Sequence, residues 1–391
     1  MVVQHNITAM NANRMLGITT GSQAKNTEKL SSGYKINRAA DDAAGLSISE
    51  KMRKQIRGLD RASQNAQDGI SSVQTAEGAL AEVHDMLQRM NELAVQAANG
   101  TNSTSDRTAI QNEITQLTTE IDRVAETTKF NETYLLKGDV NKETKIVTLE
   151  PHDAGLKGSL VESDTKGEYT FTTKLADLQA SETVMVGGKV YTIAEDGEED
   201  HEYNKYTRQE ISDFMEAELK KANGIGITSD VEDTVEKIDV GVFTIKPGTI
   251  TTAKELSFNL HVGADADMTN KINVKIDTMN SSYLGIKGLD VVGSDGIGMA
   301  ATYAIDAISD ALQKVSDQRS ALGAVQNRLE HTIKNLDNVV ENTQAAESQI
   351  RDTDMASAMV EYTKNNILAQ AGQSMLAQAN QSTQGALSLL G

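Results

Sequence analysis

The sequence predicts a mainly α-helical protein: an elongated antiparallel helical bundle or coiled coil built from both chain ends, with a β-hairpin and an inserted α+β outer domain. Three observations support this prediction. A long helical repeat runs from Ile56 to Ala97, a matching repeat runs from Ile305 to Val340, and residues 139–256 between them have a different composition. Two long helices far apart in sequence, with a distinct middle segment, are typical of a bundle that carries an insertion.

The first repeat occupies a long helix. Its apolar or small residues recur at steps of three and four, with one doubled three, at Ile56, Leu59, Ser63, Ala66, Ile70, Val73, Ala76, Leu80, Val83, Leu87, Met90, Ala94 and Ala97. This spacing keeps a narrow stripe on one helix face, which suits a coiled coil better than a globular core. No proline interrupts the helix, which would be about 60 Å long at 1.5 Å per residue. Such a stripe needs an equally long partner.

The chain offers that partner near its other end. The repeat recurs at Ile305, Ile308, Leu312, Val315, Leu322, Val325, Leu329, Ile333, Leu336 and Val340, with Arg319 in one stripe position. A shorter third helix shows the same alternation at Ile110, Ile114, Leu117, Ile121 and Val124. Residues Ser103 to Asp106 offer it an N-cap. We therefore expect three helices to pack as a bundle, with an ordinary helical core as the alternative.

Both chain ends carry little charge. The first 40 residues contain no aspartate and one glutamate, and residues 356–391 contain only Glu361 and Lys364 as charged side chains. Ser31-Ser32-Gly33 is expected to end the first helix near Leu30. Uncharged surface is easily desolvated, so we expect helices that become buried when subunits meet, against the alternative of a frayed tail. The polymerisation interface is predicted at Ile7, Met10, Leu16, Met359, Tyr362, Ile367 and Met375.

The middle of the chain is predicted to be a separate α+β insertion. Residues 139–256 hold both prolines and carry 13 basic and 25 acidic residues. Strands are expected at Tyr169 to Thr173, Val184 to Ile193 and Gly241 to Ile245, and one amphipathic helix at Gln209 to Ala222. A return segment from Leu256 to Met279 alternates apolar and polar residues, which predicts a β-hairpin leading back to the bundle.

Three domains follow from this pattern. Residues 1–40 with 356–391 are predicted to form a terminal coiled-coil domain for the inside of an assembly. Residues 41–138 with 257–355 are predicted to form the helical bundle with its hairpin. Residues 139–256 are predicted to form the variable outer insertion.

Bulk properties exclude several partners and compartments. The formal net charge of −19 argues against nucleic acid or an anionic membrane surface as a partner. With no cysteine there is no disulfide framework and no thiolate site. No cleaved secretory signal is visible in the first 30 residues, and no run of about 18 apolar residues could span a bilayer.

No catalytic, cofactor or metal site is expected. His201-Glu202 begins like the zinc-binding pattern H-E-x-x-H, but Lys205 takes the place of the second histidine. The acidic cluster of residues 195–200 could bind a hard cation weakly, yet it lacks the alternating oxygen ligands of an EF-hand, and a solvated loop is favoured. The protein is therefore predicted not to be an enzyme.

Several segments resemble bacterial flagellin. The run LSSGYKINRAADDAAGL at residues 30–46 closely resembles the N-terminal signature of that family. Other matching segments are Gln4 to Asn13, Gln88 to Gln96, Phe130-Asn131, Ala345 to Ser348 and Arg351 to Ala356. The resemblance covers about the first 138 and the last 110 residues, and residues 139–256 carry no usable match.

The resemblance implies a structural subunit that polymerises into the extracellular flagellar filament for motility. It further implies export of the unfolded chain through the flagellar channel. The implied partners are further copies of the chain, an export chaperone at the C-terminal segment, and the filament cap and hook-junction proteins. Two alternatives are a hook–filament junction protein and a filament subunit with an enzymatic outer domain.

The resemblance also implies recognition of the monomer by host Toll-like receptor 5. Gln88, Arg89, Glu92 and Leu93 resemble the recognised surface, and Glu113 on the third helix resembles a supporting position. Arg89 lies three and four residues before Glu92 and Leu93, which places all three on one helix face. The alternative is that Arg89 and Glu92 form only a solvated helix pair.

Overall fold

The computed structural model describes residues 6–139, 144–163, 167–195, 200–227, 234–293 and 298–388. The contacts within the chain group it into two compact units. The terminal unit comprises residues 1–65, 261–271 and 331–391, and the central unit comprises residues 66–260 and 272–330. Two long helices contribute residues to both units.

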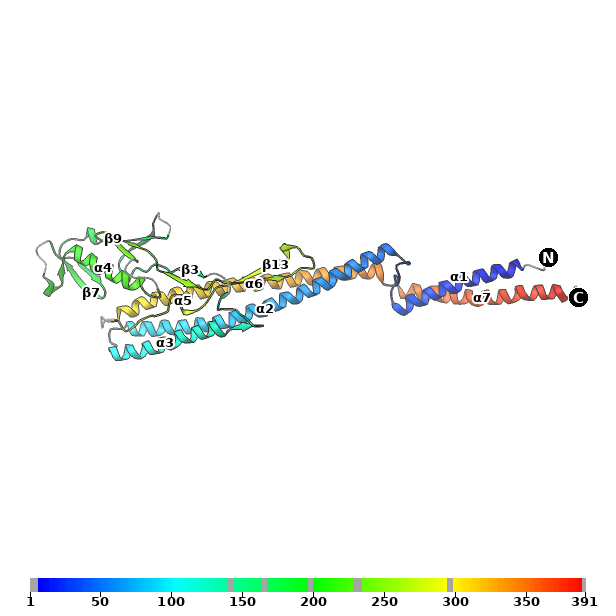
Figure 1. The fold of residues 1–391 in the computed structure, drawn as a ribbon, viewed down its shortest axis with the longest axis horizontal. Helices are drawn as coiled ribbons and strands as arrows, with labels where there is room; N and C mark the ends of the chain where they lie inside the picture. Colours follow the sequence, from blue (N-terminus) through cyan, green and yellow to red (C-terminus); the bar gives the residue numbers. More distant parts are fainter. Residues whose placement is uncertain are drawn as a thin grey trace. The chain divides into compact units, whose positions relative to one another are not determined.

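The terminal unit contains an antiparallel pair of helices, α1 (Ile7–Ser32) and α7 (Met355–Ser388), which lie side by side in Figure 1. The side chain of Asn6 caps α1 by accepting a hydrogen bond from the backbone of Ala9, and its Nδ2 donates to the carbonyl of Ala379 on α7 at 3.0 Å. Gly33 ends α1 with φ near +77°, a conformation that glycine adopts without strain. The expected helix end near Leu30 is therefore confirmed within two residues.

The long helices α2 (Ala43–Ala98) and α6 (Met299–Arg351) run antiparallel, and α3 (Thr104–Thr127) packs beside α2. Within the central unit Arg319 of α6 lies 3.4 Å from Glu77 of α2. Within the terminal unit Ser49 of α2 donates to Glu347 of α6 at 2.9 Å. A capping box of Ser103 with Asp106 begins α3, at the predicted position. The mainly helical bundle fold is thus confirmed.

The predicted stripe on α2 is largely buried. Its buried members are Leu59, Ala66, Val73, Ala76, Leu80, Val83, Leu87, Met90, Ala94 and Ala97. One departure occurs where Ile70 is half-buried and the neighbouring Gly69 is buried instead. A Cβ atom at Gly69 would come within 2.2 Å of the Leu260 side chain, so the hairpin described next covers this position.

The expected return hairpin is present as strands β12 (Leu256–His261) and β13 (Lys271–Ile276). The inward residues Ile272, Val274 and Ile276 are buried, in the alternation that the sequence predicted. After the hairpin, Asp122 of α3 caps the short helix α5 (Ser281–Leu284) by accepting hydrogen bonds from Ser281. The strands β1 (Lys129–Phe130) and β2 (Thr133–Tyr134) pair after α3.

The insertion belongs to the central unit and is built from three small sheets and one helix. One sheet has the order β4-β5-β10-β9, another pairs β3 with β11, and the third has the order β6-β7-β8. The bounds are β3 (Lys145–Thr148), β4 (Gly158–Glu162), β5 (Tyr169–Thr173), β6 (Thr183–Val186), β7 (Lys189–Ile193), β8 (Lys205–Tyr206), β9 (Val235–Asp239), β10 (Val242–Ile245), β11 (Thr249–Thr252) and α4 (Arg208–Asn223).

Two predicted strands and the predicted helix of the insertion are confirmed, and one strand is corrected. The run from Val184 to Ile193 is a hairpin of β6 and β7, because Gly187 and Gly188 both adopt positive φ and turn the chain. Alternating apolar residues on both sides of the turn resemble one continuous strand in the sequence. Only the two glycines in succession indicate the break.

The insertion shares its core with the bundle helix α6. Phe171, Phe243 and residues of α4 form a buried cluster that includes Tyr303 of α6, which is 4% exposed. The Tyr303 hydroxyl donates to Glu218 of α4 at 2.7 Å. The expected separate outer module is therefore corrected: these contacts join residues 139–256 to α6. The three-part division at 1–40, 41–138 and 139–256 with their returns stays a prediction about assembly.

Charged side chains also line this contact. His152 Nε2 lies 3.7 Å from Asp310 Oδ2 on α6, and Asn223 holds the backbone of His152 through both its amide oxygen and nitrogen. Burial raises the pKa of Asp306 on the same face, and nearby His152 opposes that shift. The loop before β4 is therefore held between α4 and α6.

Arg107 of α3 caps the C-terminus of α2 from within the core. Its side chain is 1% exposed, and its Nε donates to the carbonyl of Ala97 at 2.9 Å. A cation at this end of a helix satisfies unpaired carbonyls and interacts favourably with the helix dipole.

We expect Arg107→Ala to lower the free energy of unfolding by about 3 kcal/mol, because it leaves buried carbonyls without donors. The control is Arg123→Ala, since exposed Arg123 pairs only with Glu120 on its own helix and should contribute about 0.5 kcal/mol or less. Urea unfolding followed by circular dichroism measures both variants. Equal midpoints for the two would contradict the capping role.

Candidate functional site

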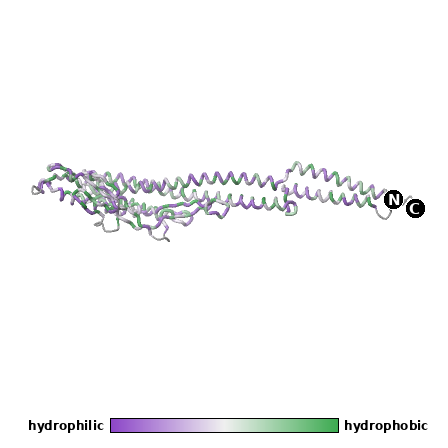
Figure 2. The backbone as a smooth tube through the Cα atoms, turned by 90° about the horizontal axis from the view of Figure 1, so that it is seen from above, coloured by the Kyte–Doolittle hydropathy of each residue, from purple (hydrophilic) through white to green (hydrophobic). Residues whose placement is uncertain are grey.

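The paired terminal helices carry the candidate assembly face. On α7 the small residues Ala369 and Ala379 are buried, and Gly372 lies beside Leu16 of α1. The large apolar side chains point away from this pairing: Ile367 is 61% exposed. Figure 2 shows green residues recurring along the two helices that end near N and C. An intramolecular coiled coil normally buries its largest apolar residues, so this pair presents them for another contact.

The predicted interface residues fall into two groups. Ile7, Met10, Met359, Ile367 and Met375 are exposed. Leu16 and Tyr362 are half-buried. The sequence analysis missed further exposed apolar residues on these helices, namely Ile18, Met355, Val360 and Leu368. Val360 and Leu368 follow directly after predicted residues, so the apolar surface of α7 is wider than one stripe.

The predicted receptor patch is partly assembled on α2 and α3. Arg89 Nε donates to Glu113 Oε1 of α3 at 2.9 Å, and its Nη1 lies 3.1 Å from Glu92 Oε2. These two carboxylates raise the pKa of the Arg89 guanidinium, Glu113 most. Gln88 is exposed, with its amide nitrogen 3.0 Å from a ring nitrogen of His84. The solvated pair of Arg89 with Glu92 is present, and it extends across two helices.

Leu93 differs from its expected place. It is only 2% exposed and belongs to the hydrophobic core of the bundle. A helix turns by 100° per residue, so Leu93 lies at the edge of the Arg89 face, and its direction depends on where the other helices pack. Leu93 therefore supports the patch from below and offers almost no contact surface of its own.

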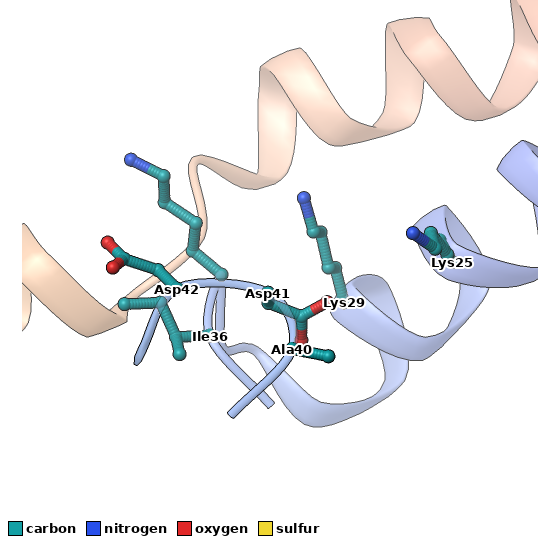
Figure 3. Close-up of a pocket in the computed structure, with 7 residues that line it drawn as sticks. Lys25, Lys29, Ile36, Ala40, Asp41 and Asp42 are labelled. Carbon is teal, nitrogen blue, oxygen red and sulfur yellow. The ribbon is translucent and has the colours of Figure 1, made fainter. Parts of the chain in front are cut away.

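A polar pocket of about 360 Å³ lies where α1 meets the linker to α2. Figure 3 shows Lys25 and Lys29 on α1, with Asp41 and Asp42 on the linker. Asp41 Oδ2 accepts the backbone N–H groups of Asn37 and Arg38, and these bonds, Arg38's first, lower its pKa with help from nearby lysines. The carboxylates thus shape the linker.

The histidine pattern considered in the sequence has no metal-binding geometry. His201 and Glu202 lie in a 3-10 turn, His201–Tyr203, and not on the α-helix that an H-E-x-x-H site requires. Within the described ranges no group of three or more potential ligands could hold a metal ion. Residues 196–199 of the acidic cluster lie outside the described residues. No helix in the described part of the chain is both long and apolar enough to cross a membrane.

Comparison with known proteins identifies the family. A model described as "Bacterial flagellin N-terminal helical region" matches residues 3–141, and one described as "Bacterial flagellin C-terminal helical region" matches residues 305–390. A flagellin of Clostridium tyrobutyricum is 43% identical, covering 98% of this chain and all of that protein. The chain belongs to the bacterial flagellin family.

Other relatives agree with this assignment. A flagellin of Halalkalibacterium halodurans is 41% identical, and the flagellar filament 31.3 kDa core protein of Treponema maltophilum is 39% identical, each over the full length of both chains. A crystal structure of Bacillus cereus flagellin is 18% identical, covers 70% of this chain and 88% of its own, and has a TM-score of 0.33.

Flagellins are structural proteins of bacterial flagellar filaments, so membership of the family assigns this chain a structural role in such a filament. The N-terminal family match covers α1, α2 and α3, and the C-terminal match covers most of α6 and all of α7. The C-terminal match begins at residue 305, later than the resemblance alone suggested. The insertion lies between the two matches.

Proposed function

We propose that the chain polymerises through the exposed apolar faces of α1 and α7 into an extracellular flagellar filament that serves motility. The observation that supports this most strongly is the inverted packing of the terminal pair. Small residues face inward and large apolar residues face outward, on helices that carry almost no charge.

The energetic argument favours burial by further copies of the chain. Fully burying one Ile or Met side chain contributes about 1.5–3 kcal/mol, and no charged group has to be desolvated on most of α7. A helical polymer buries the same face in every copy, so a modest contact is repeated along its length.

Incubation of the purified protein with filament seeds tests this function. We expect elongation of the seeds, visible by negative-stain electron microscopy and proportional to the protein added. Seeds that keep their original length at every protein concentration would contradict a filament subunit.

We further propose that the chain is exported unfolded and that a chaperone binds the C-terminal segment until assembly. The absence of cysteine and the presence of only two prolines fit threading through a narrow channel. The exposed apolar residues of α7 fit a segment that needs covering before assembly. The filament cap and the hook-junction proteins are the proposed partners at the two filament ends.

The monomer is proposed to bind Toll-like receptor 5 through Gln88, Arg89 and Glu92, supported by Glu113 and, from the core, by Leu93. A planar guanidinium held by two carboxylates is preorganised, and it can add hydrogen bonds to a partner at low entropic cost. In a filament a neighbouring subunit is proposed to cover this face, so only the monomer would be recognised.

We expect Arg89→Ala to weaken binding of the monomer to the receptor ectodomain by about tenfold or more, as for loss of a central arginine contact. Surface plasmon resonance measures the affinity. Arg123→Ala is the matched control, because Arg123 is also an exposed helix arginine paired with a glutamate three residues away. Equal binding by both variants would remove Arg89 from the site, and no binding by the wild type would remove the receptor.

A further inference from the structure

Two short linkers in the terminal unit pair with each other. One linker, residues 33–42, follows α1, and the other, residues 352–354, precedes α7. The backbone N–H of Lys35 donates to the carbonyl of Arg351 at 2.6 Å, and the N–H of Thr353 donates to the carbonyl of Gly33 at 2.9 Å. Tyr34 and Asp352 thereby form an isolated antiparallel bridge. These are the points at which the chain passes between its terminal and its long helices.

Arg351, the last residue of α6, is inserted between the linkers and α2. Its guanidinium carbon lies 4.9 Å from the centre of the Tyr34 ring. Its Nη1 donates to Glu50 Oε1 of α2 at 2.9 Å and lies 3.3 Å from Ser49 Oγ. The side chain is 14% exposed. One guanidinium therefore contacts the linker after α1 and the first turns of α2 at the same time.

A second layer of contacts supports this arrangement, which we name the Arg351 clasp (Arg351, Tyr34, Ser49, Glu50 and Glu347). Ser49 is fully buried and donates to Glu347 Oε1 one turn earlier on α6. The hydrogen bond from Arg351 lowers the pKa of Glu50, which keeps this carboxylate charged over a wider pH range. The clasp thus joins the end of α6, the start of α2 and the linker by polar contacts.

The chemistry of the clasp favours a geometric role over a large contribution to stability. The buried Nε of Arg351 has no hydrogen-bond partner, which offsets part of what the other contacts contribute. A planar guanidinium can stack on a ring and donate in its plane at once, whereas a lysine ammonium has no plane to align. The linkers bury little else that could hold them, with Ile36 as their one buried apolar side chain in the described residues.

We propose that Arg351 is a positioning residue: stacked on Tyr34 and bonded to Glu50, it holds the α1–α7 pair in one orientation on the adjoining ends of α2 and α6. This proposal rests on the proposed assembly function, because a fixed orientation presents the apolar faces of α1 and α7 to the next copy in a single geometry. Preorganisation of this kind lowers the entropy lost on assembly.

A distance measurement tests the clasp directly. The chain has no cysteine, so Lys54→Cys on α2 and Gln373→Cys on α7 place two unique spin labels at exposed positions of the terminal unit. Pulsed electron resonance then gives the distribution of distances between α2 and α7. It is recorded for the monomer and for seeded filaments in which labelled subunits are diluted with unlabelled ones.

The variants separate the clasp from general stability. Arg351→Gln removes the planar cation and Tyr34→Leu removes the ring, whereas Tyr34→Phe keeps the ring. Arg53→Gln is the matched control, since exposed Arg53 also pairs with Glu50, at 3.7 Å, but touches no linker. Circular dichroism and urea unfolding monitor the helix content and stability of all four.

We expect Arg351→Gln and Tyr34→Leu to broaden the distance distribution about twofold or more at unchanged helix content, as a lost restraint allows further orientations. The critical concentration for filament growth should rise about tenfold, the effect of one lost well-packed charged contact. Tyr34→Phe and Arg53→Gln should match the wild type in both measurements. A distribution in Arg351→Gln as narrow as in the wild type would overturn the clasp, whatever the filaments do. A wild type that does not extend seeds would overturn the assembly function, and the distances in the monomer would still decide on the clasp.

Discussion

Removal of residues 356–391 is expected to abolish filament growth and to leave the helices of the central unit folded. The deletion takes away nearly all of α7 with its exposed residues Met359, Ile367 and Met375, and it leaves α1 without the helix that packs on it. The central unit contains none of the deleted residues. Seeded growth and circular dichroism measure the two properties. A truncated chain that forms filaments of normal stability would show that the terminal pair is not the assembly surface.

A point substitution tests the same face without removing a helix. Ile367→Asp adds a charge where the monomer exposes an apolar side chain, so the monomer should keep its stability. Burial of that unpaired charge in a filament costs about 3 kcal/mol per subunit, which corresponds to an increase of about 100-fold in the critical concentration. The control is Ile238→Asp on β9 of the insertion, which is exposed to a similar extent, 66% against 61%. Equal growth of the two variants would contradict a dry contact at Ile367.

Replacement of residues 145–250 by a short Gly/Ser linker is expected to preserve filament growth and to lower the stability of the central unit. Lys145 and Thr252 are opposite each other in the β3–β11 pair, so the cut ends are neighbours and a short linker can join them. The loss of stability arises because Met299 and Tyr303 of α6 lose the apolar cluster that covers them. We expect about 2–4 kcal/mol for exposing these two large side chains.

A second variant of the deletion separates the two effects. In the shortened chain, Met299→Gln with Tyr303→Gln should reduce aggregation, because the exposed apolar surface is then polar. Light scattering measures aggregation, and electron microscopy measures seeded growth. Loss of all polymer from a shortened chain that keeps its helix content would show that the insertion makes essential contacts between subunits.

The helical elements of this protein are largely determined by local pattern. The stripe on α2, the matching stripe on α6 and the capping residues of α3 predict these helices within a few residues at most ends. They do so because a coiled-coil face depends only on spacing along one chain. The absence of charge at the two ends likewise predicts surfaces that other copies can cover. Single-chain periodicity was also sufficient for the return hairpin.

The direction of individual side chains required the tertiary structure. Leu93 lies on the same helix face as Arg89 in the sequence, but it is buried because α2 receives partners on more than one side. Gly69 is buried in place of Ile70 because the hairpin strand at Leu260 packs over it. A helical wheel gives angles around one axis, and it does not contain the positions of the neighbouring elements.

The clasp and the shared core of the insertion are decided by tertiary structure alone. Arg351 and Tyr34 are more than 300 residues apart, and nothing in the spacing of either one indicates a stacked pair. Tyr303 follows the pattern of an ordinary bundle helix, yet it packs among residues of α4 and the insertion strands. The sequence by itself determined the helices, their apolar faces and the family. Which faces meet depends on contacts between distant segments, and these form only when the whole chain has folded.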